Sequence, residues 1–331
     1  MSCLEDRYGR RIDYMRVSVT DRCNLRCVYC LPEGGVELKP HAEILSYEEI
    51  ALILREAASL GVSRVRLTGG EPLVRRGLVP FAARIARIPG IREVSLTTNG
   101  VLLREYAEAL LWAGVQRLNV SLDSLRPDRF RALTRGGDLS RVWSGIRRAL
   151  ELGFDPVKLN VVLMRGVNDD EVPDFARLAV TLPLHVRFIE LMPLGEAKGQ
   201  SSRLVTAEEV LGRVGAEWPL VPADGVAGGG PARYFRLGDS PGTVGVIAPL
   251  SRHFCDRCNR LRLEADGRLS PCLADGAGVE VRRAARAEVR RVLAEAVMAK
   301  PARHSMDAAA AGGSSGGGAD CGRRYMSRLG G

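Results

Sequence analysis

The 331-residue sequence lacks the features of several common protein classes. No apolar run approaches the length that crosses a bilayer, and the residues from Met1 to Asp6 contain no signal-peptide core, so we expect a cytoplasmic protein with no membrane partner. Aromatic residues amount to only 5% and are scattered, which disfavours a base-stacking surface and a nucleic-acid partner. A dinucleotide-type glycine fingerprint is also absent, which argues against a doubly wound nucleotide-binding sheet.

Positive charge is in excess. The sequence has 48 Lys and Arg residues against 39 Asp and Glu residues, a net charge of +9. This balance favours an anionic partner, and the shortage of aromatic residues makes a small phosphorylated substrate a better candidate than nucleic acid. A high-GC coding bias would by itself account for much of the arginine. The hydrophobic content of 46% is that of an ordinary soluble protein large enough for one barrel or two domains.

Three cysteines, Cys23, Cys27 and Cys30, lie close together after an apolar-alternating run, and we call them the first cysteine set. No fourth cysteine is within reach. A closed structural zinc site uses four protein ligands, whereas a [4Fe–4S] cluster held by three thiolates keeps one iron open. The spacing therefore favours a cluster; a zinc site with a distant ligand and three unligated thiols remain the alternatives.

A second cysteine set, Cys255, Cys258 and Cys272, is incomplete in the same way. Cys321 lies beyond a low-complexity stretch and is left out, and His253 would complete a zinc site as an alternative. Clustered cysteines without a secretion signal indicate metal-binding thiols rather than disulfides. Two three-cysteine sites together suggest two clusters, each with an open iron.

Short apolar runs alternate with helical patterns from about Met15 to Leu191, which predicts six βα units and a partial (β/α)6 barrel of the TIM type within the α/β class. A capping box at Ser46 predicts the start of the first helix, which ends at Leu60. The other expected helices are 79–87, 103–113, 139–152 and 171–182, and the expected strands are 15–19, 65–68, 94–98, 118–122, 157–163 and 186–191.

Polar or glycine-rich residues follow several of these strands, at 68–72, 97–100, 121–124 and 191–193. In a barrel of this kind the loops after the strands carry the chemistry, so these segments and the first cysteine set should surround one mouth. Taken singly, each segment is ordinary turn chemistry.

We expect residues 1–220 to form the barrel and residues 221–331 to form a smaller α+β domain that closes its mouth. In that second part we expect a linker at 219–230, strands at 233–237 and 243–247, a helix at 279–300 and a flexible stretch at 308–319. The run 259–263 alternates like a strand, which places Arg260 and Arg262 on one face beside the second cysteine set, as a fork for phosphate oxygens.

These motifs resemble those of a known family. The first cysteine set, with Tyr29 before its last cysteine, resembles the signature of the radical S-adenosylmethionine (SAM) superfamily, and Gly69-Gly70-Glu71-Pro72 resembles that superfamily's motif for the methionine amino group. The second set, the intervening Asn259-Arg260-Leu261-Arg262 and the final Gly-Gly resemble the GTP 3′,8-cyclase family of molybdenum-cofactor biosynthesis. The similarity extends from about Tyr14 to the C-terminus.

The resemblance implies the radical SAM type of barrel, two [4Fe–4S] clusters, SAM as cofactor and GTP as substrate. The first set would hold the cluster that chelates SAM, whose reductive cleavage gives a 5′-deoxyadenosyl radical. That radical would abstract the C3′ hydrogen of GTP, and C3′ would then bond to C8. The second set would hold a cluster whose open iron meets the guanine base.

The resemblance also implies roles for individual residues. SAM would contact Tyr29, Gly70, Ser121 and Met192. GTP would contact Arg16, Arg66, Thr97, Lys158, Arg260, Leu261 and Arg262. Arg260, Arg262 and the C-terminal Gly330 and Gly331 are supporting candidates for catalysis, since a glycine tail can enter a crowded pocket. A frayed terminus is the alternative for the tail. The Ala/Gly/Ser-rich stretch and Cys321 depart from the family pattern.

The implied partners are a cyclic pyranopterin monophosphate synthase downstream, a flavodoxin- or ferredoxin-like electron donor and a second copy in a homodimer. Two other functions compete with this interpretation. One is a different radical SAM enzyme with an auxiliary cluster, such as a peptide maturase. The other is a zinc-dependent RNA-binding protein, which would be colourless and bind nucleic acid in a strongly salt-dependent way.

Overall fold

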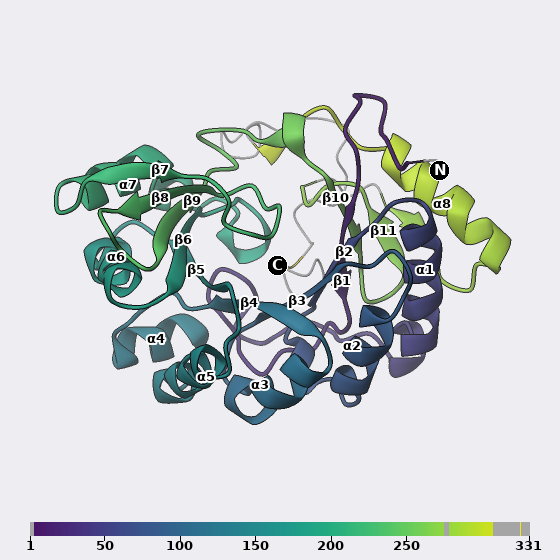
Figure 1. Ribbon diagram of the computed structural model, residues 1–331, viewed down its shortest axis with the longest axis horizontal. Coiled ribbons are helices and arrows are strands. Elements are labelled where there is room, and N and C mark those ends of the chain that lie inside the picture. Colours follow the sequence, from purple (N-terminus) through teal and green to yellow (C-terminus); the bar gives the residue numbers. More distant parts are fainter. Residues whose placement is uncertain (1–2, 275–277, 307–324, 326–331) are drawn as a thin grey trace.

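A computed structural model of the chain describes residues 3–274, 278–306 and 325. Its centre is a curved sheet in which β1 to β6 are parallel neighbours in chain order, with α1 to α6 on the outer face (Figure 1). The strands are β1 Tyr14–Ser18, β2 Arg64–Thr68, β3 Glu93–Thr98, β4 Val115–Ser121, β5 Val157–Leu163 and β6 Leu184–Glu190. The helices are α1 Tyr47–Ser59, α2 Leu78–Ala86, α3 Leu103–Trp112, α4 Pro127–Thr134, α5 Leu139–Glu151 and α6 Val172–Thr181. The predicted α/β barrel is confirmed.

Local sequence accounts for these elements. The strands are rich in β-branched residues, and their side chains are buried on both faces, as a parallel sheet covered by helices requires. Helix α1 begins where expected, because Ser46 accepts the backbone N–H of Glu49 and Glu49 accepts the N–H of Ser46.

The chain after residue 220 continues the same sheet rather than forming a separate one. At one edge β9 (Thr243–Ile247) pairs parallel with β6, followed by β8 (Arg233–Leu237) and β7 (Leu220–Ala223). At the other edge β10 (Arg260–Leu263) pairs parallel with β1, followed by β11 (Arg268–Ser270) and β12 (Val279–Glu280). The C-terminal part thereby widens the sheet, by adding strands beyond both β1 and β6. The division at residue 220 stays a prediction.

Some expected elements are wrong. The expected linker at 219–230 begins with β7, because residues 220–223 pair with β8. The last helix, α8, spans Arg286–Met298 and begins later than expected, because Val279–Glu280 pair with β11 and Arg283 has a left-handed φ of 59°. Helices α4 and α7 (Ala207–Gly215) were not expected. The predictions for 308–319, Cys321, Gly330 and Gly331 lie outside the described residues.

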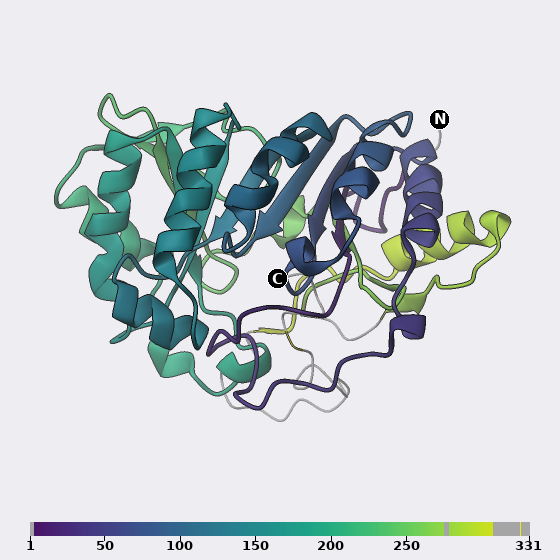
Figure 2. The same cartoon turned by 90° about the horizontal axis from the view of Figure 1, so that it is seen from below.

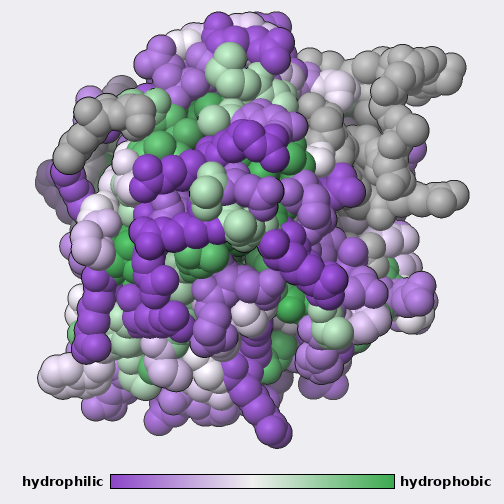
Figure 3. Space-filling view, turned by 90° about the vertical axis from the view of Figure 1, so that its right-hand side faces the viewer, coloured by the Kyte–Doolittle hydropathy of each residue, from purple (hydrophilic) through white to green (hydrophobic). Residues whose placement is uncertain are grey.

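The surface next to α1 and α8 is largely hydrophilic, with apolar residues in small groups (Figure 3). None of the helices in residues 3–274 and 278–306 is long and apolar enough to cross a membrane.

Candidate active site

The first cysteine set lies on an irregular loop after β1, at one end of the barrel (Figure 2). Two backbone hydrogen bonds hold the start of this loop to the segment after β2. Gly70 N–H donates to Thr20 O over 2.8 Å, and Glu71 N–H donates to Arg22 O over 2.8 Å. A Cβ atom on Gly70 would clash with the Arg22 carbonyl. The glycine is therefore required by the close approach of two backbones, whatever ligand it also meets.

Glu71 ties the ends of β2 and β3 together beneath this loop. Its carboxylate accepts the Thr98 hydroxyl at 2.8 Å and the Asn99 N–H at 2.6 Å, while the Asn99 amide lies 3.8 Å from the Cys23 sulfur. Burial raises the pKa of Glu71 to about 7. The pKa of the Cys23 thiol is also raised, first by burial and further by the negative charge of Glu71.

Asp123, directly after β4, holds the other end of the cysteine loop. It accepts the Tyr29 hydroxyl at 2.8 Å and the Val162 N–H at 2.8 Å. Burial raises the pKa of Asp123 to about 6. Burial and then the negative charge of Asp123 raise the pKa of Cys27 well above its usual value. Thiolates at this site therefore need a positively charged partner, which a metal cluster supplies.

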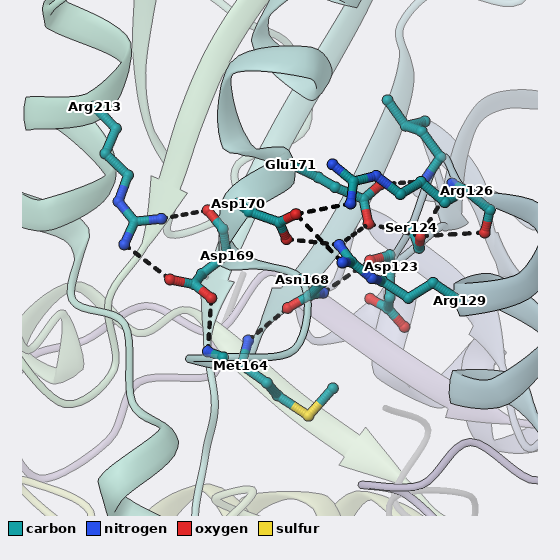
Figure 4. A network of polar contacts seen from close by, with 12 residues as sticks. Asp123, Ser124, Arg126, Arg129, Met164, Asn168, Asp169, Asp170, Glu171 and Arg213 are labelled. Carbon is teal, nitrogen blue, oxygen red and sulfur yellow. Dashed lines mark hydrogen bonds and ion pairs between the residues drawn. The ribbon is translucent and has the colours of Figure 1, made fainter.

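A network of polar contacts fixes the segment that carries Asp123 (Figure 4). Asn168 donates to Asp123 O over 2.8 Å and to Val162 O over 2.9 Å. Next to it, the Ser124 hydroxyl donates to Glu171 over 2.7 Å, and Arg129 donates to the same carboxylate over 2.6 Å. Since Glu171 and Asn168 are fully buried, the network is rigid, and Tyr29 is anchored to it through Asp123.

The second cysteine set lies around β10 and β11, the strands that extend the sheet beyond β1, and all three of its cysteines line a cavity. Cys255 is in a 3₁₀ turn (Cys255–Arg257), Cys258 ends that turn and Cys272 follows β11. Burial and the charges of the other two cysteines raise the pKa of Cys255. Burial also opposes ionisation of Cys258, but the charges of Arg260 and Lys300 outweigh it and lower the pKa of that thiol to about 6.

The zinc alternative has a geometric basis at this second site. The ligand atoms of His253, Cys255 and His304 lie within 4.8 Å of one another, the one such group in the described part of the chain. The two rings contact each other over 3.1 Å, and His304 Nε2 lies 2.8 Å from Pro249 O. The histidines thus already have hydrogen-bond partners, which a zinc ion would have to displace.

A cavity inside the barrel brings the second cysteine set together with a group of basic residues. Among the predicted site residues, those that line it are Arg16, Arg66, Met192, Cys255, Cys258, Arg260, Arg262 and Cys272. Arg187, on β6, also lines the cavity and was missed by the sequence analysis. Because β6 also contains His185 and Glu190, the sequence pattern did not single out Arg187.

The cations around this cavity repel one another. Burial, then Arg187 and Arg66, lower the pKa of Lys158 to about 6, and Glu93 is the only acid among its main electrostatic neighbours in the described residues. Burial and Arg260 lower the pKa of Arg262 to about 10. So many buried cations with so little compensating acid fit a multiply charged anion.

Buried polar atoms at the same place have no hydrogen-bond partner within the described structure. They include Arg187 Nε and the Tyr14 hydroxyl, both on residues that line the cavity. Because an unpaired buried polar atom is costly, these groups fit a polar ligand in the cavity.

The remaining predicted residues are not among those that line the cavity. Thr97, on β3, is buried, and its hydroxyl has no hydrogen-bond partner within the described structure. Lys158 is buried and donates to the backbone oxygen of Ala227. The Leu261 side chain is fully buried in the hydrophobic core and does not line the cavity. Tyr29 and Gly70 lie at the first cysteine loop, and Ser121 ends β4.

Comparisons with known proteins agree with this arrangement. Residues 17–179 match the radical SAM superfamily, and residues 184–306 match a family described as Molybdenum Cofactor Synthesis C. The GTP 3′,8-cyclase of Pelotomaculum thermopropionicum is 54% identical over 310 residues, covering 92% of this chain and 95% of that protein. That of Moorella thermoacetica is 52% identical, covering 92% and 96%. The chain belongs to the GTP 3′,8-cyclase family.

Solved structures support the fold. SuiB of Streptococcus suis bound to S-adenosylmethionine aligns with a TM-score of 0.60 over 85% of this chain, at 13% identity, and the chain spans about two thirds (66%) of SuiB. The match to the radical SAM superfamily implies that the protein uses SAM and a [4Fe–4S] cluster. The first cysteine set fits that cluster, since it offers three partly buried free thiols, and no fourth cysteine lies beside them in the loop that the structure describes.

Proposed function

We propose that this protein is a GTP 3′,8-cyclase that converts GTP to 3′,8-cyclo-7,8-dihydro-GTP for molybdenum-cofactor biosynthesis. The observation that carries the proposal is one cavity lined by both the second cysteine set and buried arginines from β1, β2, β6 and β10. Relatives more than half identical across nearly the whole chain carry this name. Cys23, Cys27 and Cys30 would hold the cluster that binds SAM, and one-electron reduction by an external donor would then give methionine and a 5′-deoxyadenosyl radical able to take the C3′ hydrogen of GTP.

In this proposal Cys23, Cys27 and Cys30 hold the first cluster, and Asp123 and Glu71 keep their loop in place. Gly70 and Ser121, at the ends of β2 and β4, lie where the carboxyl ends of the strands meet the cysteine loop. The residues assigned to SAM are Tyr29, Gly70, Ser121 and Met192. Their task is to orient SAM, while the reaction chemistry belongs to the cofactor.

The triphosphate of GTP would be bound by the buried cations. Guanidinium groups bind phosphate oxygens in a bidentate way. Burial and mutual repulsion lower the pKa of Lys158 and Arg262, and a phosphate would relieve the repulsion. The residues assigned to GTP are Arg16, Arg66, Thr97, Lys158, Arg260, Leu261 and Arg262. Of these, Arg260 and Arg262 lie beside the second cysteine set. Leu261 would take part through its backbone only.

We assign a second [4Fe–4S] cluster to Cys255, Cys258 and Cys272. Cys258 has two basic neighbours, Arg260 and Lys300. All three cysteines line the cavity where GTP would bind, which supports a substrate-binding cluster with an open iron. Gly330 and Gly331 are assigned to the same pocket. We also propose a cytoplasmic location, a homodimer, a flavodoxin- or ferredoxin-like donor and a downstream pyranopterin monophosphate synthase.

The test is anaerobic turnover of the reconstituted protein with SAM, a low-potential reductant and GTP. We expect 5′-deoxyadenosine to form much faster with GTP than without it, together with a cyclised product of unchanged mass. Equal rates with and without GTP would remove GTP as substrate. ATP at the same concentration is the matched control, because it has the same triphosphate and lacks guanine.

The alternatives make different predictions. A peptide maturase would release 5′-deoxyadenosine only with a peptide substrate, and the likeness to SuiB at 13% identity concerns the fold alone. A zinc-dependent RNA-binding protein would be colourless, whereas two cubanes give a brown protein with about eight irons. Metal analysis of anaerobically purified protein separates these cases.

A further inference from the structure

Lys300, two residues after the end of α8, is almost completely buried, with 2% of its surface exposed. A lysine at this depth is unusual, because burial of an ammonium group costs free energy unless its donors are satisfied. Its Nζ atom lies at the second cysteine set, far along the chain from the residues that it contacts. No sequence motif pointed to it.

The ammonium group makes three contacts that together span this site. Nζ donates to Arg260 O over 2.8 Å and to Pro271 O over 2.8 Å, and it lies 3.7 Å from the Cys258 sulfur. Pro271 immediately precedes Cys272, and Arg260 begins β10. One side chain therefore connects two of the three thiol-bearing segments with the strand that carries the arginines.

A second basic residue, Arg10, binds the backbone of Cys255, which carries the third thiol, and the backbone of the residue after Lys300. Arg10 donates to Cys255 O over 2.6 Å and to Pro301 O over 2.7 Å, and it pairs with Asp6 at 2.6 Å. Unlike Arg10, Lys300 contacts a thiol sulfur directly, and its positive charge favours the thiolate. Among the described residues, then, Lys300 is the side chain best placed to affect both the geometry and the charge of the site.

We propose that Lys300 is a positioning residue for the second [4Fe–4S] cluster, whose thiolates it holds in place and whose negative charge it offsets. The inference rests on the proposed assignment of that cluster to Cys255, Cys258 and Cys272. Outer-shell partners of metal ligands typically contribute about 10- to 100-fold to metal affinity. A buried positive charge next to a cluster also favours the reduced state, which carries one more electron.

The experiment uses the full chain with Cys23, Cys27 and Cys30 replaced by Ala, so that the second cluster is the only one observed. In this background we compare Lys300→Met, Lys300→Gln and Lys300→Arg. Lys198→Met, at an exposed lysine, is the matched control. The measurements are the rate of iron loss to a chelator and the midpoint potential from an electron paramagnetic resonance titration. Circular dichroism establishes that each variant is folded.

We expect Lys300→Met and Lys300→Gln to lose iron about tenfold faster than the parent. The cluster that remains should have a more negative midpoint potential than in the parent. In Lys300→Arg the potential should return most of the way to the parent value. A purely structural lysine would change the iron loss and leave the potential unmoved. Lys300→Gln keeps a donor for the two carbonyl groups, so it decides the outcome if Lys300→Met does not fold.

Three negative outcomes are distinguishable. If the background protein binds no cluster, the assignment of the second cluster fails. If it binds a cluster and the neutral variants match the parent and Lys198→Met in both iron loss and potential, the role of Lys300 is overturned. An Arg variant whose potential equals that of Lys300→Met would likewise exclude the effect of charge.

Discussion

The two cysteine sets have the same number of thiols and opposite electrostatic surroundings. Two buried acids, Glu71 and Asp123, flank the first set, and they contribute with burial to the raised pKa of its thiols. Basic residues flank the second set: burial opposes ionisation of Cys258, but the charges of Arg260 and Lys300 outweigh it and lower the pKa of that thiol to about 6. An acidic environment disfavours addition of an electron, so it suits a strongly reducing cluster, whereas a basic one suits an anionic substrate. The difference indicates a division of tasks between the two sites.

The largest expected effect comes from removing a thiol. Cys27→Ala should abolish all cleavage of SAM, because the first set has no spare ligand. Cys258→Ala should abolish the GTP product and leave slow, GTP-independent cleavage of SAM. The measurement is 5′-deoxyadenosine by chromatography, with and without GTP. Loss of GTP-independent cleavage in both variants would contradict the division of tasks.

Removing one buried cation should have the next largest effect. Arg262→Met deletes a guanidinium from the cavity wall, and we expect a fall of about 100-fold in kcat/KM for GTP, as for a buried charged contact worth about 3 kcal/mol. GTP-independent cleavage of SAM should be unchanged. Arg104→Met, on the outer surface of α3, is the control and should behave as the parent. A change in the basal cleavage of SAM would place Arg262 at the first site instead.

Gly70→Ala should damage the first site by a packing effect. The added methyl group would meet the Arg22 carbonyl, and overpacking against backbone costs about 3 kcal/mol at such a position. Urea unfolding of the metal-free protein measures this cost, and iron analysis should show loss of the first cluster only. Gly212→Ala, in α7 with open space around it, is the matched control and should be neutral or stabilising. Equal stability of the two variants would refute the backbone contact.

The smallest expected effect is a pH dependence from Asp123. Burial raises the pKa of Asp123 from its ordinary value of 3.8 to about 6, so the folded state binds the proton more tightly than the unfolded one. The stability that this group contributes is therefore greatest at low pH and is lost as pH rises through about 6.

Between pH 4 and pH 7, the free energy of unfolding of the metal-free parent should fall by roughly 2 kcal/mol relative to Asp123→Asn. Urea unfolding at both values gives the difference, and comparison with Asp123→Asn cancels the titration of Glu71. Parallel pH profiles of parent and variant would show that Asp123 is not protonated on folding.

The sequence predicted those parts of the fold that depend on local patterns. The capping box at Ser46 and the alternation of Arg260 and Arg262 each use residues close in the chain, and both are confirmed. Strands β7 and β12 were not predicted, because they exist only through pairing with β8 and β11. Helix α8 was predicted to begin too early, because the pairing of Val279–Glu280 with β11 was not visible in the sequence.

The site shows the same limit. The cysteines and the cations of β10 could be found from spacing, and Asp123 was included only as part of the polar segment 121–124. Arg187 and Lys300 were missed, since their importance comes from burial and from contacts with distant segments. The sequence analysis assigned Gly70 to SAM, and that role stays a prediction. The structure adds that its lack of a side chain is needed for the approach of Arg22.

The most direct test of the central claim follows one hydrogen atom. GTP carrying deuterium at C3′ is incubated with the reconstituted protein, SAM and reductant, and the 5′-deoxyadenosine is analysed by mass spectrometry. If the first site makes the radical and the second places GTP against it, the 5′-deoxyadenosine will carry the deuterium. Unlabelled 5′-deoxyadenosine formed at the same rate would contradict the account.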